Sequence, residues 1–184
     1  RPDDWHLHFR DGAMLEETVP ATARVFRRAI VMPNLTPPVT TVALAEAYRE
    51  RILAAIPAGV DFEPLMVLYL TDQTPVEEIE RAAQSPFVHA FKLYPAGATT
   101  NSDSGVTNPA RIHHLYEALE KHDLPFLVHG EVTEPEIDIF DRERVFIDRY
   151  LNDIRERFPA LRIVFEHVTT SEGVDFVREG GDLT

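Results

Sequence analysis

The sequence lacks cysteine altogether, which excludes a disulfide framework and a thiolate metal site. It also has no block of Lys or Arg: 18 basic residues stand against 31 acidic ones, for a net charge of -13. Nucleic acid and anionic membrane surfaces are therefore excluded as partners. No apolar run approaches the roughly 18 residues of a membrane span, and no signal-like apolar segment is present. These absences predict a soluble cytoplasmic protein in which any metal is held by histidine, carboxylate or a less usual ligand.

What is present is ordinary globular composition, with 184 residues of which 44% are hydrophobic. This length suits a single domain with a sizeable core. The chain starts without Met, almost directly in a predicted strand, and stops at "REGGDLT" just after a helix. We interpret residues 1–184 as the N-terminal part of one longer domain that continues after Thr184.

Short β-rich apolar runs alternate with helical patterns along the whole chain. The predicted strands are residues 5–9, 29–32, 64–70, 88–93, 125–129 and 162–167. The predicted helices between them are residues 42–56, 76–84, 109–122 and 137–158. This order is typical of parallel βαβ units with right-handed crossovers.

Two architectures have this order, an open doubly wound sheet and a (β/α)8 TIM barrel. A doubly wound sheet predicts a glycine-rich turn after the first strand, and "FRDGAM" is not one. A barrel needs about 250 residues, so this chain supplies about the first six of its eight βα units. The pattern favours the α/β barrel.

The stretch "DDWHLHFRDG" places histidines two residues apart in the first strand. Because alternate side chains of a strand share a face, His6, His8 and Arg10 are expected to point one way. The apolar residues between them are expected to enter the core from the other face: Trp5, Leu7 and Phe9.

Polar residues also gather at the ends of later strands. Asn34 follows the second, Lys92 is near the end of the fourth, and His129 and His167 end the fifth and sixth. The carboxyl ends of barrel strands form the catalytic mouth. A lone strand histidine is more often structural, but four at strand ends favour a metal site, and neutral imidazole suits Zn, Ni, Fe or Mn.

Lys92 in "AFKLYP" is costly to bury unless it is paired or neutralised. One interpretation is an ion pair with a buried Glu or Asp. Others are a Schiff-base amine and a lysine that takes up carbon dioxide as a carbamate, which could bridge two metals. Beside four histidines the carbamate is favoured, since an ammonium would repel the metals.

Five motifs in order resemble the bacterial-type dihydroorotases of the amidohydrolase superfamily: "PDDWHLHFRDG", "MPNLTPPVTT", "KLYPAGATTNSDSGV", "FLVHGEV" and "VFEHVTT". The resemblance implies a TIM barrel that interconverts L-dihydroorotate and N-carbamoyl-L-aspartate in pyrimidine biosynthesis. It implies two Zn2+ ions per subunit and a homodimer. One metal is assigned to His6 and His8, the other to His129 and His167, with carboxylated Lys92 (N6-carboxylysine) as the bridge.

The same resemblance assigns the substrate carboxylate to Arg10 and Asn34, since a guanidinium fork suits a planar anion. Thr99 and Thr100 are assigned to a mobile lid, although the loop "AGATTNSDSG" alone indicates only a solvated connection. The family's acid/base Asp belongs to the eighth strand, which is expected beyond Thr184. The catalytic residue therefore has no counterpart among these 184 residues.

Three rival functions stay open at this point. A hydantoinase-like or allantoinase-like cyclic amidohydrolase would have the same metal ligands, but Arg10 and Asn34 favour a substrate with a carboxylate. A metal-free barrel acting as a scaffold would typically have lost ligands. An aldolase-like barrel would explain Lys92 as a Schiff base and leave four histidines without a role.

Overall fold

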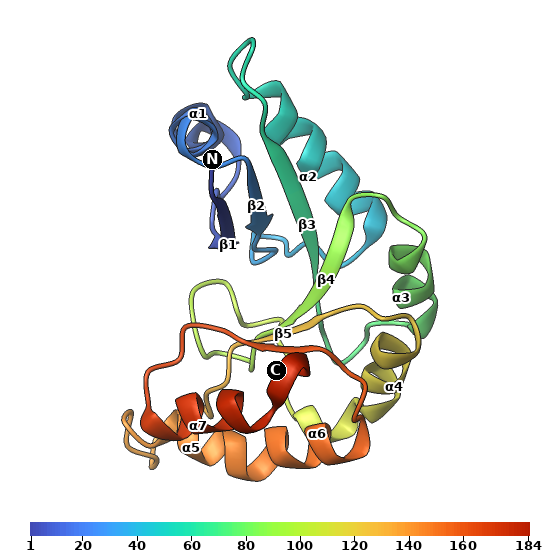
Figure 1. Ribbon diagram of the computed structural model, residues 1–184, viewed down its shortest axis with the longest axis vertical. Coiled ribbons are helices and arrows are strands. Elements are labelled where there is room, and N and C mark those ends of the chain that lie inside the picture. Colours follow the sequence, from blue (N-terminus) through green and yellow to red (C-terminus); the bar gives the residue numbers. More distant parts are fainter.

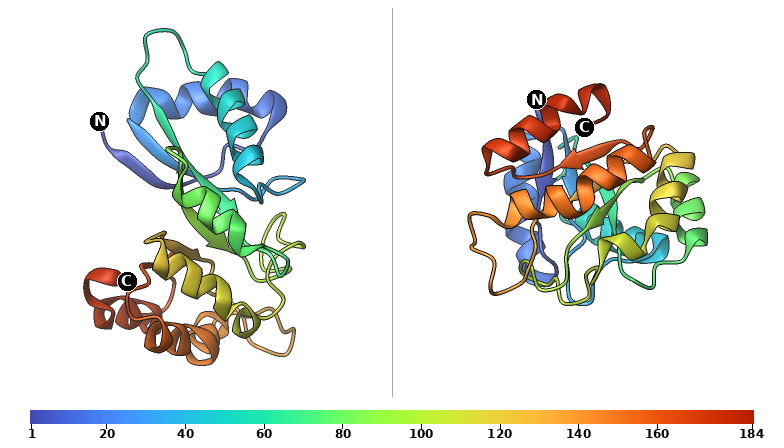
Figure 2. Two further views of the ribbon diagram at one scale, coloured as in Figure 1. Left: turned by 90° about the vertical axis from the view of Figure 1, so that its right-hand side faces the viewer. Right: turned by 90° about the horizontal axis from the view of Figure 1, so that it is seen from below.

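The computed structural model describes residues 1–184 as a single six-stranded parallel sheet that curls with its helices on the outside (Figures 1 and 2). The strands are β1 (Asp3–Leu7), β2 (Arg28–Val31), β3 (Glu63–Tyr69), β4 (Val88–Leu93), β5 (Phe126–Val128) and β6 (Ile163–Phe165). The helices are α1 (Leu15–Val25), α2 (Val42–Ala54), α3 (Val76–Ala83), α4 (His113–Lys121), α5 (Arg142–Phe146), α6 (Asn152–Arg157) and α7 (Ser171–Glu179). None of these helices combines the length and apolarity that crossing a bilayer requires.

The strands follow one another across the sheet in chain order, β1-β2-β3-β4-β5-β6. Every neighbouring pair is parallel. A doubly wound sheet reverses its strand order at a switch point, and no reversal occurs here. The topology is therefore that of consecutive barrel units, with β1 and β6 as the two edges.

Apolar side chains form two layers, one on each side of the sheet. The outer layer is a cluster of 38 buried residues between sheet and helices. The inner layer is small and comes from four successive strands or their ends: Met32, Val67, Ala90 and Leu127. This division matches a barrel wall, whose strands are covered by helices outside and by one another's side chains inside.

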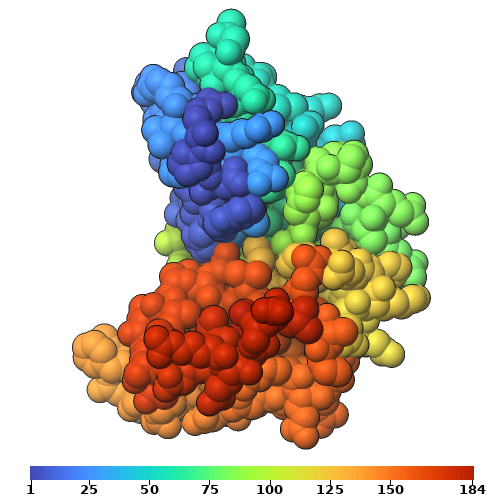
Figure 3. All heavy atoms as spheres, viewed as in Figure 1, coloured from blue at the N-terminus to red at the C-terminus, as the bar shows by residue number.

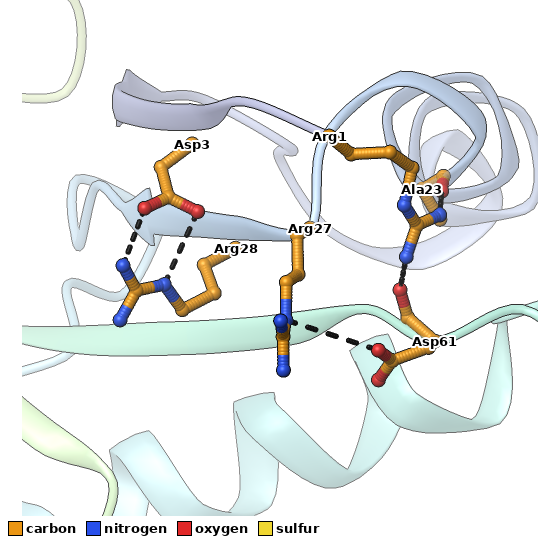
Figure 4. A network of polar contacts seen from close by, with 6 residues as sticks. All are labelled: Arg1, Asp3, Ala23, Arg27, Arg28 and Asp61. Atoms are coloured by element: carbon orange, nitrogen blue, oxygen red, sulfur yellow. Dashed lines mark hydrogen bonds and ion pairs between the residues drawn. The ribbon is translucent and has the colours of Figure 1, made fainter.

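Polar contacts hold β1, β2 and α1 together at the N-terminal ends of the strands (Figure 4). Arg28 of β2 donates through Nε to Asp3 of β1 at 3.1 Å and forms a second bond through Nη2. Arg1 donates to the carbonyl of Ala23 at 2.8 Å. These contacts fix the end of the sheet opposite the predicted mouth.

The predicted helix at residues 137–158 starts later than expected, since residues 137–141 precede α5. From Arg142 to Arg157 the helical backbone is unbroken, and a π-helical segment, Ile147–Leu151, lies between α5 and α6. Helix α1 was not among the predicted helices, and its interior contains Pro20, which removes a backbone donor. Burial of Leu15, Val19 and Ala23 on one face of α1 outweighs that loss.

The prediction that Trp5 enters the core is also wrong. Phe9 is fully buried, but Trp5 is 57% exposed. The pairing of β1 with β2 shifts register between Asp4 and Leu7, so strict alternation fails in this strand. Trp5 instead lines an inner hollow of about 480 Å³ with side chains from the other strands, among them Ile30, Leu65, Leu127 and Val164. The surface is recessed where the N-terminal segment (blue) faces the C-terminal segments (orange and red) in Figure 3.

Candidate active site

The four strand-end histidines lie together at one end of the sheet. His6 is in β1 and His8 just after it, and their Nε2 atoms are 3.1 Å apart. The ring centroids of His129 and His167 are 4.6 Å apart, and those of His6 and His167 are 5.5 Å apart. Because β1 and β6 are the two edge strands, this last contact shows how strongly the sheet curls.

Glu166 joins this cluster and was missed from the sequence. Its side chain is 4% exposed, and Oε1 lies 3.0 Å from Nδ1 of His6. Side chains of consecutive strand residues point to opposite faces, yet Glu166 and His167 both reach the cluster. His167 does so because its φ is 42°, a left-handed conformation that non-glycine residues rarely adopt. The sequence contained one indication of such a residue: a buried Lys92 needs a buried Glu or Asp as its partner.

Lys92 is fully buried in β4, and its Nζ forms an ion pair with Glu166. Burial lowers the pKa of Lys92, and the charge of Glu166 opposes that shift. Burial alone would raise the pKa of Glu166, but the hydrogen bond from His6 and the charge of Lys92 outweigh it and lower that pKa. The unmodified lysine thus forms a buried ion pair with Glu166, which is one of the interpretations that the sequence left open.

The donors at this site fit a metal chemically. Two ligands of a tetrahedral zinc, each about 2.05 Å from the ion, lie about 3.3 Å apart, close to the separation of the His6 and His8 nitrogens. Nδ1 of His8 and Nε2 of His129 are buried without a hydrogen-bond partner. No three His, Asp or Glu side chains surround a common point at ligand distance. The structure therefore brings the histidine nitrogens close together, but it does not place three ligands around one metal position.

The acid/base Asp expected from the family has no position in this structure. After β6 the chain passes through α7 and a short 3-10 turn, Gly181–Leu183, and reaches Thr184 without forming a further strand. The carboxylates that contact imidazoles of the cluster are Glu166 and Glu131, and Oε2 of Glu131 lies 3.9 Å from Nε2 of His129. A catalytic Asp on a strand beyond Thr184 therefore stays a prediction.

Arg10 and Asn34 lie beside the histidines. Arg10 has a φ of 64°, its carbonyl accepts the Tyr48 hydroxyl at 2.6 Å, and its Nη1 is buried without a partner. Asn34 is 1% exposed and its Oδ1 also has no partner. Two unsatisfied polar groups at the mouth are suited to a polar ligand. Their assignment to a substrate carboxylate stays a prediction.

The loop after β4 is more than a solvated connection. Asn34 donates to the carbonyl of Thr100 at 2.9 Å, and Asn101 donates back to the carbonyl of Asn34 at 3.1 Å. Ser102 is fully buried and donates to the carbonyl of Thr99 at 2.6 Å. The loop is therefore tethered at the mouth, while the side chains of Thr99 and Thr100 are exposed.

Two of the histidines are held neutral. Burial, followed by the charge of His6, lowers the pKa of His8 to about 4. Burial, followed by the charge of Lys92, lowers the pKa of His167 to about 4. Both rings are therefore unprotonated at pH 7, which is the form that binds metals.

These shifts predict acid sensitivity of the metal-free protein. The ordinary histidine pKa is 6.5, so between pH 6.5 and about 4 the unfolded chain binds protons at His8 and His167 that the folded chain does not. Stability then falls as the pH falls through this window and is fully present above it. Urea midpoints at pH 7, 5.5 and 4.5 measure the loss. His8→Asn should show a shallower pH dependence, and an equal slope would contradict the prediction.

Comparisons with known proteins agree with this geometry. The amidohydrolase family model matches residues 3–174. A dihydroorotase from Alcanivorax borkumensis is 80% identical over all of this chain and 54% of its own length. A crystal structure of dihydroorotase from Campylobacter jejuni superposes with a TM-score of 0.88 at 37% identity, over 99% of this chain and 52% of that one. A Saccharomyces cerevisiae dihydroorotase in complex with 5-fluoroorotic acid gives 0.86 at 30% identity, over 97% and 50%.

The chain thus spans about half the length of these relatives. The similarities confirm the resemblance to dihydroorotases seen in the sequence motifs, and they confirm the fold class, six βα units of a TIM barrel. The family match covers nearly the whole chain and includes every histidine of the cluster. The chain belongs to the amidohydrolase family.

Proposed function

We propose that this chain is the N-terminal part of a dihydroorotase barrel that interconverts L-dihydroorotate and N-carbamoyl-L-aspartate in pyrimidine biosynthesis. The observation that supports it most is the convergence of four strand-end histidines on the buried Lys92–Glu166 pair. The 80% identity to a dihydroorotase supports the choice of reaction. A homodimer located in the cytoplasm is part of the proposal.

In this proposal two zinc ions share the mouth, and other divalent metals could replace them. His6 and His8 would hold one ion, His129 and His167 the other, and Lys92 as N6-carboxylysine would bridge them. When bound, such a pair of ions lowers the pKa of a water to near neutrality and polarises the amide carbonyl under attack. The neutral state of His8 and His167 suits this role.

The protein's own residues bind and orient the substrate. The partnerless Nη1 of Arg10 is a donor suited to a substrate carboxylate. The partnerless Oδ1 of Asn34 is an acceptor, so Asn34 would bind the carboxylate only through its Nδ2, which donates to Thr100 here. A guanidinium takes a carboxylate by two parallel hydrogen bonds, and both proposed substrates carry one. The yeast relative is in complex with 5-fluoroorotic acid, also a carboxylate, which supports a substrate of this class. The bond from Asn34 to Thr100 links substrate binding to the loop that carries Thr99.

Arg10→Lys tests the carboxylate assignment. Lysine keeps the charge but loses the planar fork, so we expect KM for dihydroorotate to rise about 10- to 100-fold, which corresponds to roughly 1.4–2.8 kcal/mol of lost binding. Zinc content should not change. Steady-state kinetics and metal analysis measure the two effects. Loss of zinc from Arg10→Lys would contradict the assignment and place Arg10 in support of the metal site.

The proposed reaction is tested by comparing substrates on the complete, zinc-loaded protein. Turnover of dihydroorotate without turnover of an uncharged hydantoin is expected, because only the first offers a carboxylate to Arg10. The reverse preference would replace the proposal with a hydantoinase-like activity. Absence of bound metal from the purified protein would contradict the proposed chemistry as a whole.

A further inference from the structure

Glu143 is a buried carboxylate outside the histidine cluster. It lies in α5 and is 4% exposed. It accepts the backbone N–H of Thr169 at 3.0 Å and that of Thr170 at 2.9 Å. The hydroxyls of the same two threonines also donate to it, that of Thr169 at 3.2 Å. A buried charge with four donors is well satisfied, and all four donors come from one short turn.

That turn begins two residues after His167. The left-handed φ of 42° at His167 needs support from both sides, because this conformation is unfavourable for a residue with a Cβ. On the strand side, the N–H of Glu166 donates to the carbonyl of Val128 at 3.2 Å. On the other side, Glu143 holds Thr169 and Thr170. The backbone of His167 is thus fixed between two anchors.

The packing around Glu143 leaves little space for another arrangement. A Cβ at Gly173 in α7 would lie 2.5 Å from Oε1 of Glu143 and 2.7 Å from Cγ1 of Val168. Glycine is required there by this close approach. The N–H of Gly173 in turn donates to the Thr170 hydroxyl at 3.1 Å. Helix α5, the turn after His167 and the start of α7 therefore form one connected unit.

We infer that Glu143 is a positioning residue, which holds His167 in the left-handed conformation that turns its ring toward His129 and His6. The inference rests on the proposed function, since it makes Glu143 a determinant of metal affinity at the His129–His167 pair. Glu143 touches neither metal nor substrate in this role. It acts through the backbone N–H groups and the hydroxyls of Thr169 and Thr170.

Glu143→Gln in the complete protein tests this role. The amide places a donor where an acceptor faced the threonine N–H and hydroxyl groups, so the turn loses part of its support. We expect the affinity for the zinc at the His129–His167 pair to fall about 10- to 100-fold, the usual effect of removing support from a metal ligand, while the other zinc is retained. Zinc titration against a competing chelator measures the affinity, and visible absorption of the Co2+-loaded protein reports the altered coordination.

Glu78→Gln is the matched control. Glu78 is also 4% exposed, accepts the N–H of Val42 at 2.6 Å, and pairs with Arg81. It supports the start of α2 and has no contact with the turn after His167. Both variants should unfold at lower temperature, but only Glu143→Gln should lose zinc affinity and change the Co2+ spectrum.

Equal zinc affinity in Glu143→Gln and the wild type would overturn the inference and leave the proposed function intact. A wild type that binds no zinc would overturn both. If Glu143→Gln does not fold, Thr169→Val removes one hydroxyl donor while the carboxylate stays. It should lower zinc affinity less but in the same direction, with Thr169→Ser restoring it; unchanged affinity in Thr169→Val would also overturn the inference.

Discussion

Replacing Lys92 with alanine is expected to remove both zinc ions from the complete protein and to lower its turnover of dihydroorotate by roughly 10³-fold or more, a loss of about 4 kcal/mol of transition-state stabilisation. Lys92 is fully buried and its Nζ faces Glu166 beside the histidines. Carbon dioxide reacts with the neutral amine. Burial lowers the pKa of Lys92, which favours this neutral form. Without Lys92 the proposed carbamate cannot form, and the two pairs of histidines would have no anionic bridge.

Lys92→Glu is the informative companion. Its carboxylate supplies two oxygens on a shorter side chain, and it would lie beside Glu166, whose like charge it must tolerate. We expect partial zinc content and little activity. Metal analysis of both variants, together with crystallographic density at Nζ of the zinc-loaded wild type, checks the prediction. An unmodified ammonium with both ions at full occupancy would contradict the carbamate and the bridge.

The grouping of the histidines could be anticipated because it depends only on strand order and direction. Once the chain alternates β and α, the carboxyl ends of all strands meet at one mouth. His6, His129 and His167 then come together although they are far apart in the sequence. No prediction of loops or side-chain rotamers was needed for that step. What this reasoning could not supply was which neighbouring residues share the mouth.

Glu166 shows why. Once His167 is assigned to the mouth, alternation along the predicted strand at residues 162–167 would put Glu166 on the opposite, outer face. In the structure β6 ends at Phe165, Phe165 belongs to the outer cluster, and Glu166 points inward. The left-handed backbone at His167 then returns its ring to the same side. The left-handed φ of His167 places the side chains of two consecutive residues on the same side of the sheet. No pattern in the sequence predicts such a backbone angle.

Trp5 and Glu143 illustrate two further limits. The register shift in β1 is a property of its pairing with β2, so it is invisible in the β1 sequence alone. The contacts of Glu143 join residues 26 and 27 positions apart. In a helical pattern such a glutamate is indistinguishable from a solvated one. Long-range polar contacts of this kind are specified by the assembled fold rather than by local propensity.

The isolated segment of residues 1–184 is expected to show no measurable dihydroorotase turnover. Its sheet has two unpaired edges, β1 and β6, and open edges favour association with other chains. The inner hollow leaves Trp5 57% and Val164 43% exposed. Apolar surface of this kind is a site of association or aggregation. The relatives are about twice as long, and we propose that strands beyond Thr184 cover this hollow and supply the acid/base Asp.

The measurement compares the segment with the complete protein at equal zinc and equal chain concentration. Light scattering should show association of the segment, and an assay in the direction of dihydroorotate hydrolysis should give no signal above buffer. Mixing or co-expressing the segment with the remaining part of the protein should restore activity, because β1 and β6 would then regain partners. Turnover by residues 1–184 alone would show that the histidine cluster suffices for the reaction, and it would contradict the need for the remaining barrel strands.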